Sequence, residues 1–147
     1  MILKQVYIFF FLTLFFVNCS NQETENTPNT LYTNKEKWFN SSVVDYTYVF
    51  QISCYCIEES TRPKSVLVRN GLIVNVNNEN FNEETHSYVL TIDDLFYEIE
   101  NATNQGAAKL DVNYDTKYGF PYYIFIDRDI RIADEEISYS VSDFRPL

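Results

Sequence analysis

Histidine and glycine are scarce in this chain of 147 residues, and each shortage excludes a class of site. The single histidine, His86, is the only imidazole that a hydrolytic triad could use, and no glycine-framed serine or cysteine accompanies it. The three glycines, Gly71, Gly106 and Gly119, form neither of the glycine-rich phosphate-binding motifs. A structural zinc site needs four ligands, and a single histidine can supply only one of them. We therefore predict a protein that is not an enzyme and that holds no metal or cofactor.

Positive charge is also scarce, because 11 Lys and Arg stand against 21 Asp and Glu, for a formal net charge of -10. This balance argues against nucleic acid as a partner. A calcium loop needs converging oxygens and a tight glycine turn, and no acidic stretch has that spacing, so we predict solvated surface. The segment ADEE before the last strand is also a candidate recognition patch for a cationic partner. The acidic clusters are Glu58–Glu59, Glu83–Glu84, Asp93–Asp94, Asp127 with Asp129, and Asp134–Glu135–Glu136.

One long apolar run opens the chain, over residues 6–17, and only Thr13 interrupts it. A run of about 12 residues suits a signal-peptide core, whereas a helix that spans a bilayer takes roughly 20. Cys19 follows Phe16-Val17-Asn18, a loose form of the motif that precedes a lipid-modified cysteine. We predict that residues 1–18 are a lipoprotein signal peptide and that Cys19 is lipidated. The alternative is an ordinary secretory signal that is cleaved nearby, with Cys19 incidental.

Lipidation of Cys19 would anchor the protein to a membrane of the cell envelope, because two or three acyl chains such as palmitate hold stably without a basic patch. Ser20 does not supply an aspartate that retains lipoproteins in the inner membrane, so the outer membrane is favoured in a cell with two membranes. Residues 19–31 are interpreted as the lipidated cysteine and a flexible tether, and residues 32–147 as one domain. The predicted partners are the membrane and another envelope protein.

Aromatic residues are abundant, with 12 Phe and 12 Tyr, and they favour a well-filled β core. Apolar side chains alternate with polar ones, as in half-buried strands, in three segments: residues 44–56, 109–114 and 137–141. Asn70-Gly71 lies between two apolar runs and is a strong hairpin signal. A second hairpin is predicted over residues 122–132, with its turn at residues 127–129.

Helical spacing occurs twice and indicates an internal repeat. Thr91 and Asp94 form a candidate capping box before an apolar stripe that stops near Gly106, and Thr33 and Glu36 offer the same box earlier. We predict an α+β fold of two layers, in which an antiparallel sheet of about six strands carries two helices on one face and an α-β-β-β unit is duplicated. Chance recurrence of caps and prolines is the alternative. The recurring residues, at a constant offset, are Thr33, Glu36, Trp38 and Pro63, then Thr91, Asp94, Phe96 and Pro121.

Cys54 and Cys56 have the most scope for chemistry. With Cys19 lipidated they are the two remaining thiols, and an oxidising envelope compartment invites a disulfide. On a regular strand their Cα atoms would be roughly 6.5 to 7 Å apart, so a bridge requires the strand to end or bulge at Tyr55. A strained bridge of this kind would be reducible and a candidate redox site. Two buried free thiols and a metal site are the alternatives.

Several segments together resemble a known family of bacterial lipoproteins and secreted proteins catalogued as domain of unknown function 6174. The resemblance covers nearly all of residues 32–144, and its most specific parts are Tyr114-Asp115 followed by Gly119 and Pro121, and the segment DEEISY. It implies a small envelope domain, often lipid-anchored, with no established activity, cofactor or catalytic residues. The segments are Trp38, YTYVFQISCYC, PKSVLVRNG, TIDDLFYEIE and VNYDTKYGFPYYIFIDRDIRIADEEISYSV.

Tyrosines beside an acidic group are typical of binding surfaces. The predicted binding patch therefore consists of Tyr114, Asp115, Tyr118 and Tyr122. We predict a lipid-anchored, non-enzymatic binding module of the cell envelope, whose sheet or turn region holds another protein or a ligand. The alternative is a thiol-disulfide active envelope protein that uses Cys54 and Cys56.

Overall fold

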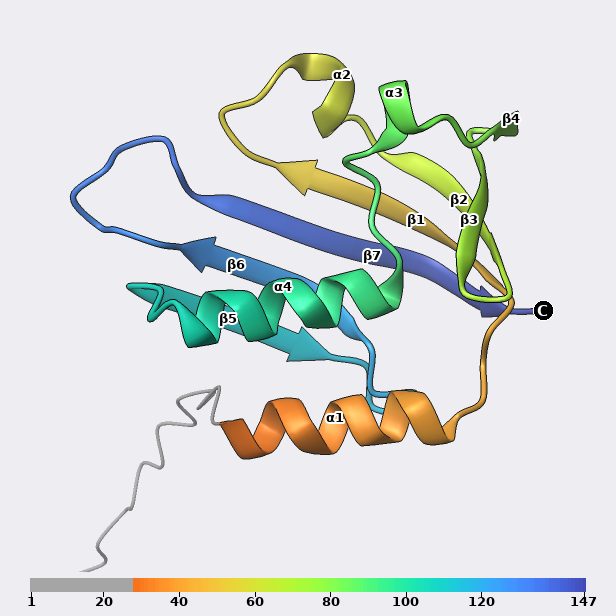
Figure 1. Cartoon of the computed structure of the whole chain (residues 1–147), viewed down its shortest axis with the longest axis horizontal. Helices are drawn as coiled ribbons and strands as arrows, with labels where there is room; N and C mark the ends of the chain where they lie inside the picture. Colours follow the sequence, from red (N-terminus) through yellow and green to blue (C-terminus); the bar gives the residue numbers. More distant parts are fainter. Residues whose placement is uncertain (1–27) are drawn as a thin grey trace, which may run out of the picture.

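The computed structural model describes residues 28–147, which form four helices and seven strands (Figure 1). The predicted signal peptide and Cys19 lie outside the described residues, and α1 begins within the segment interpreted as a tether. None of the described helices is long and apolar enough to cross a membrane. The elements are α1 (Pro28–Asn40), β1 (Tyr46–Ser53), α2 (Glu58–Thr61), β2 (Lys64–Arg69), β3 (Leu72–Val76), β4 (Glu79–Asn80), α3 (Glu83–His86), α4 (Ile92–Asn104), β5 (Lys109–Tyr114), β6 (Pro121–Asp127) and β7 (Ile137–Pro146).

The strands form one antiparallel sheet in the order β4-β3-β2-β1-β7-β6-β5. The prediction of a mixed fold of helices and an antiparallel sheet is confirmed. The predicted count of six strands is wrong, because the two-residue strand β4 adds a seventh by pairing with β3. Asn77 and Asn78 make the turn between them with φ angles of 51° and 67°, which a two-residue hairpin turn favours. The Asn70-Gly71 hairpin is confirmed, with φ angles of 49° and 74°.

The prediction that two helices cover one face of the sheet is wrong. Only α4, among the described helices longer than four residues, packs broadly on the sheet, against β5 and β6, whereas α1 runs alongside α4 (Figure 1). The reason lies in their side chains. Of the α1 side chains that the structure describes, Trp38 alone is buried, and its indole N–H donates to Asp93 at 3.1 Å. The buried residues of α4 are Ile92, Leu95, Phe96, Ile99 and Ala102.

The start of α4 is held both by its own cap and by the central strand. The predicted capping box is confirmed, since Thr91 Oγ1 accepts from the Asp94 N–H at 3.1 Å and Asp94 Oδ2 accepts from the Thr91 N–H at 2.9 Å. The Tyr46 hydroxyl of β1 accepts from the Ile92 N–H at 3.1 Å, and the Tyr48 hydroxyl donates to the Leu90 carbonyl. These buried hydroxyls replace water at the helix N-terminus and fix α4 over the sheet.

Two further local predictions are wrong. The capping box at Thr33 and Glu36 does not form, because α1 begins at Pro28 and Thr33 lies inside the helix. The second predicted hairpin does not form either, because β6 ends at Asp127 and β7 begins only at Ile137. Residues 128–136 are instead a loop between these strands, which we call the β6–β7 loop.

The turn between β5 and β6 packs directly on α1. Gly119 has φ of +82°, and a Cβ added there would lie 2.5 Å from the Asn34 carbonyl oxygen and 2.9 Å from the Lys37 Cβ. Lys37 Nζ donates to the Thr116 carbonyl at 2.9 Å. Gly119 is therefore required both for its backbone conformation and for the close approach of the helix.

We predict that Gly119→Ala lowers the free energy of unfolding more than Gly71→Ala does. Both glycines have a positive φ, but a Cβ at Gly71 would meet no atom within 4 Å. Gly71→Ala should cost about 1 to 2 kcal/mol from the backbone alone, and Gly119→Ala should cost about 1 to 3 kcal/mol more from overpacking. Denaturant titration of the two variants measures the difference. Equal losses would show that α1 does not pack on this turn.

Candidate functional site

The two faces of the sheet differ sharply in composition. The face under α4 is apolar, whereas the opposite face, which we call the open face, carries short polar side chains that alternate with the buried ones. Val49, Leu67, Tyr123 and Phe125 are half-buried on this face. The open face can therefore be hydrated and can still bury apolar surface on binding. Its polar residues include Gln51, Ser53, Ser65, Asn113, Ser138, Ser140 and Ser142.

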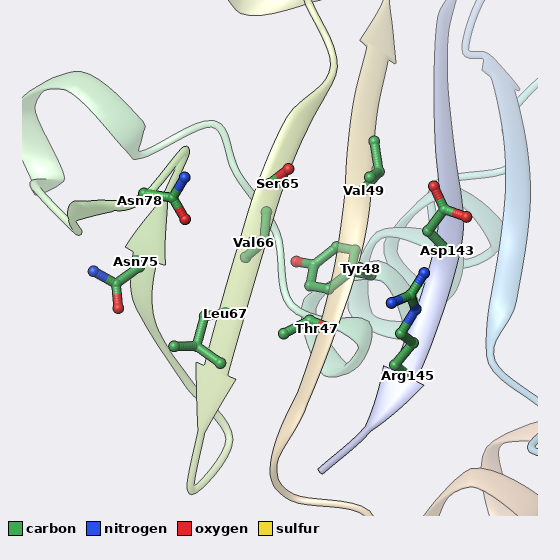
Figure 2. A pocket seen from close by; sticks show the side chains of 10 residues that line it. All are labelled: Thr47, Tyr48, Val49, Ser65, Val66, Leu67, Asn75, Asn78, Asp143 and Arg145. Atoms are coloured by element: carbon green, nitrogen blue, oxygen red, sulfur yellow. The ribbon is translucent and has the colours of Figure 1, made fainter.

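A hollow of about 480 Å³ lies on the open face over β1, β2, β3 and β7 (Figure 2). Asp143 and Arg145 of β7 stand on one side of it, and Asn75 and Asn78 stand on the other. Side chains from β1 and β2 lie between them: Thr47, Val49, Ser65 and Leu67. The hollow thus combines apolar contact area with hydroxyl, amide and charged groups that can fix the orientation of a bound partner.

A second hollow, of about 400 Å³, lies beside the β5–β6 turn and meets the first at Asp143. Its lining includes Asp115, Lys117, Tyr118 and Tyr122 from the turn and the start of β6. Asp143 is the residue that the two linings share. We call the two hollows together the face groove.

A bulge in β7 places Asp143 between the two hollows. The pairing of β1 with β7 shifts register between Thr47 and Val49, so that Asp143 and Phe144 both lie opposite Tyr48. Asp143 takes φ of +50° and is exposed. Phe144 packs against Phe120, with ring centroids 4.4 Å apart. The extra residue of a bulge redirects neighbouring side chains, and here it leaves Asp143 on the groove.

Two of the four charged groups of the face groove, Asp143 and Arg145, are available for a partner. Neither Asp143 nor Arg145 takes part in an ion pair among the described residues. Lys117 Nζ donates to the Tyr118 hydroxyl at 2.8 Å, and this bond raises the pKa of Lys117 so that it stays charged. Two acids and two bases therefore line a groove that is close to neutral overall.

The structure brings three of the four predicted patch residues together. Asp115, Tyr118 and Tyr122 line the second hollow, where Tyr122 is 45% exposed. Asp115 also shapes the turn, because its Oδ1 accepts from the N–H groups of Lys117 and Tyr118 at 2.9 and 2.6 Å. Tyr114 lies apart from them. Its ring stacks on Phe96 of α4 with centroids 6.3 Å apart, and burial raises the pKa of its hydroxyl.

Sequence reasoning missed most of the face groove. Asp143 and Arg145 lie beyond the residues predicted as the last strand, and a bulge leaves no pattern in side-chain polarity. Asn75 and Asn78 sit in the hairpin of β3 and β4, for which the Asn77-Asn78 pair was an available turn signal. From the sequence pattern, Thr47 and Leu67 are predicted only to lie on the less buried face of their strands.

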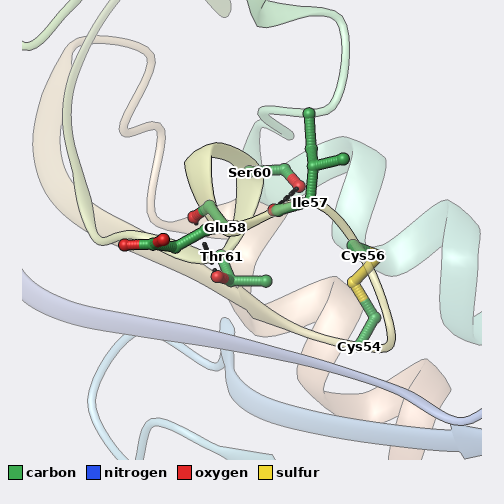
Figure 3. The surroundings of a disulfide bond; sticks show 6 residues. All are labelled: Cys54, Cys56, Ile57, Glu58, Ser60 and Thr61. Carbon is green, nitrogen blue, oxygen red and sulfur yellow. Dashed lines mark hydrogen bonds between the residues drawn. A yellow bond between two sulfur atoms is a disulfide. The ribbon is translucent and has the colours of Figure 1, made fainter.

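Cys54 and Cys56 form a disulfide immediately after β1 (Figure 3). β1 ends at Ser53 and the chain bends, so that the two Cα atoms are 5.2 Å apart, within the range of a disulfide. Cys54 is half-buried, Cys56 is exposed, and Tyr55 between them is 86% exposed. The pair therefore lies in an accessible loop before α2, unlike the alternative of two buried thiols. His86, the single histidine, makes a local contact instead: its Nδ1 accepts from the Asn82 N–H at 3.2 Å.

The fold and the groove define a small domain in which one antiparallel sheet is covered on one face and open on the other. The chain belongs to the family of unknown function DUF6174, whose pattern matches residues 30–146. The family resemblance drawn from the sequence is thereby confirmed, while the lipoprotein assignment stays a prediction. Comparison with curated proteins and with solved structures finds no match to this chain.

Proposed function

We propose that this protein is a lipid-anchored, non-enzymatic module of the cell envelope that holds another envelope protein in the face groove. The observation that carries the proposal is the pairing of free charges with tyrosines on the open face. Asp143 and Arg145 lack ion-pair partners among the described residues. Tyr118 and Tyr122 line the second hollow together with Asp143, and Arg145 lines the first. Tyrosine and arginine are enriched at the centres of protein interfaces.

The remaining groove residues support a protein partner. Serine, threonine and asparagine side chains supply hydrogen bonds that adapt to a partner, while rigid tyrosines supply contact area at low entropic cost. Val49 and Leu67 add half-buried apolar surface between them. A surface of this composition matches protein recognition better than recognition of a strongly charged polymer.

Tyrosine and arginine in the groove lead to a crosslinking prediction. A photoreactive residue placed at Leu67 or Tyr122 should form one adduct of a single mass in intact cells. The same residue at Tyr97, which is 64% exposed on α4, serves as the matched control and should form none. Arg145→Ala should reduce the groove adduct about tenfold or more, as loss of an interface hot spot does. Equal adducts from Tyr97, or none from the groove, would contradict the proposal.

The predicted lipid anchor supports the envelope assignment. The short apolar run before Cys19 favours export, and the acyl chains would hold the domain at a membrane, with the outer membrane favoured in a diderm cell. Cys19 lies outside the described residues, so the assignment depends on the sequence alone.

We predict that Cys19→Ser moves the protein from the membrane fraction to the soluble fraction, because the acyl chains are its anchor. Intact mass of the membrane-purified protein should show loss of residues 1–18 and added acyl mass. Cys54→Ser is the matched control and should leave the protein in the membrane. An unmodified Cys19, or membrane retention of the Cys19→Ser variant, would exclude the lipoprotein assignment.

The accessible disulfide favours one second candidate, a thiol-disulfide exchange protein. A thiolate of a dithiol substrate would attack Cys56 Sγ, form a mixed disulfide and release the Cys54 thiolate. The second substrate thiolate would then resolve the mixed disulfide, so that the substrate is oxidised and the cysteine pair is reduced to two thiols. Exposed disulfides are the ones that exchange readily.

This candidate predicts a specific redox behaviour. Equilibration in glutathione buffers, followed by alkylation and mass measurement, should find the Cys54–Cys56 pair half-reduced at about -180 to -230 mV, where exchange proteins operate. Because Cys56 is exposed, two alkyl groups should add after reduction without denaturant. A potential below about -300 mV would mark the bond as structural and leave the binding proposal alone.

The sheet order also supports the duplicated α-β-β-β unit. Read across the sheet, β3-β2-β1 is followed by β7-β6-β5, so the second set of three repeats the order of the first without reversal. Each set follows one of the two long helices, α1 or α4. We infer that the two halves arose from one unit that was copied in tandem.

A further inference from the structure

Four apolar side chains stand exposed on two loops at one end of the sheet. Tyr55 and Ile57 belong to the segment between β1 and α2, Ile130 and Ile132 belong to the β6–β7 loop, and each is more than half exposed. The two loops are neighbours, because the end of β1 pairs with the start of β7. We call these four residues the loop end. Exposed apolar side chains that gather in one region mark a surface that meets a protein or a membrane.

The direction of α1 shows at which end of the domain the described chain begins. The indole N–H of Trp38 donates to Asp93 at the start of α4. Lys35, nearly one turn earlier in α1, forms an ion pair with Glu100 in the second half of α4. The two helices are therefore antiparallel, and Pro28 lies toward the C-terminal end of α4.

The C-terminal end of α4 is in turn next to the loop end. Arg128, the first residue of the β6–β7 loop, donates from Nη1 to Oε1 of Gln105, which follows α4 directly, at 2.8 Å. Figure 1 shows the start of α1, the β6–β7 loop and the segment between β1 and α2 at the same end of the long axis. The described chain thus begins at the end of the domain that carries the exposed apolar side chains.

The length of chain before Pro28 limits how far the domain can stand from a membrane. Pro28 comes nine positions after Cys19, and nine residues reach about 30 Å even when fully extended. α1 has 13 residues and is about 20 Å long, so the opposite end of the domain is that much farther from the anchor. Lipidation of Cys19, on which this inference rests, would therefore hold the loop end nearer to the bilayer than the opposite end.

We propose that the loop end rests on the lipid bilayer, with its four apolar side chains inserted at the level of the headgroups. Tyrosine suits this level, because its ring is apolar while its hydroxyl can stay hydrated. Exposure alone does not select this end, since the opposite end has exposed apolar side chains too; the position of the anchor selects it. Those at the opposite end are Phe39, Val44, Leu72 and Leu147.

Local bonds hold both loops in shape and leave their apolar side chains exposed. The Cys54–Cys56 disulfide, with Cα atoms 5.2 Å apart, closes a tight bend around Tyr55. In the β6–β7 loop, the Asp129 carbonyl accepts from the Ile132 N–H at 2.8 Å. A backbone group that is paired inside its own loop approaches lipid at less cost than an unpaired one.

The contact is apolar and does not depend on a basic patch. Both arginines of the β6–β7 loop pair with acids, Arg128 with Glu98 at 3.6 Å and Arg131 with Asp129 at 2.6 Å. Residues 134–136 of the same loop are all acidic and would be repelled by an anionic lipid. Zwitterionic phosphatidylcholine is therefore the probe to use.

This orientation keeps the first hollow of the face groove accessible. Thr47 lies near the start of β1 and Arg145 near the end of β7, which is the end of the sheet opposite to the loop end. A domain that meets the bilayer with its loop end would thus present this hollow away from the lipid.

Quenching of tryptophan fluorescence tests the contact in the protein purified from its own membrane. Tyr55→Trp places an indole in the loop end, and Leu72→Trp places one at a similarly exposed position at the opposite end. Each variant is reconstituted in phosphatidylcholine vesicles with or without bromine on the acyl chains. Bromine should remove most of the added emission of Tyr55→Trp and leave that of Leu72→Trp unchanged. The unchanged protein gives the background from the buried Trp38.

A second change measures the apolar contribution. Ile130→Asp, combined with Tyr55→Trp, should lower the ratio of inserted to free loop end, read from the quenched fraction, about tenfold, because an apolar side chain no longer leaves water. Leu72→Asp, combined with the same Tyr55→Trp change, is the matched control and should leave the quenched fraction unchanged.

The outcomes separate the loop contact from the anchor. Equal quenching at positions 55 and 72, or none at position 55 while the chain stays with the vesicles, overturns the inference and leaves the lipid anchor standing. Intact mass of the same preparation reports the anchor independently. If Cys19 is unmodified, the proposed anchor fails, and the loop contact fails with it unless position 55 is still quenched.

Discussion

The pairing of β1 with β7 is the contact on which the rest of the structure depends. β1 is the first strand of the chain and β7 the last, so their hydrogen bonds join β1–β3 and β5–β7 into one sheet. The bulge in this pair sends Phe144 toward Trp38 and Phe120 and leaves Asp143 on the open face. Without the pair, the two halves would expose their inner edges and the face groove would lose a wall.

Most of the fold follows from local patterns, and the errors have identifiable causes. Alternation of apolar residues found the strands, and the Thr91 capping box found α4, because both signals are local. The start of α1 was missed because a helix that buries only Trp38 of its described side chains has no apolar stripe. Ile130 and Ile132 continue the alternation of a strand, yet they are 82% and 54% exposed in the β6–β7 loop. The second hairpin was wrongly predicted because so short a stretch of alternation cannot distinguish a strand from a loop.

The candidate site was predictable only where it is local. Asp115 and Tyr118 lie in one turn and Tyr122 lies at the start of β6 directly after it, so their proximity follows from spacing. Tyr114 comes immediately before Asp115, but strand alternation and the register shift between Asn113 and Tyr114 direct its side chain toward α4. The groove wall on β7 depends on sheet order and on a bulge, and neither property is encoded in a short stretch of sequence.

The placement of charge separates the two surfaces that matter. The face groove is lined by Asp115 and Asp143 and by Lys117 and Arg145, so a strongly acidic chain has a nearly neutral groove. Acidic residues also lie at the end of β6 and in the β6–β7 loop, where Asp127 is buried and burial raises its pKa. Under the proposed function, the groove would select a partner by short-range hydrogen bonds and tyrosine contacts and not by long-range attraction.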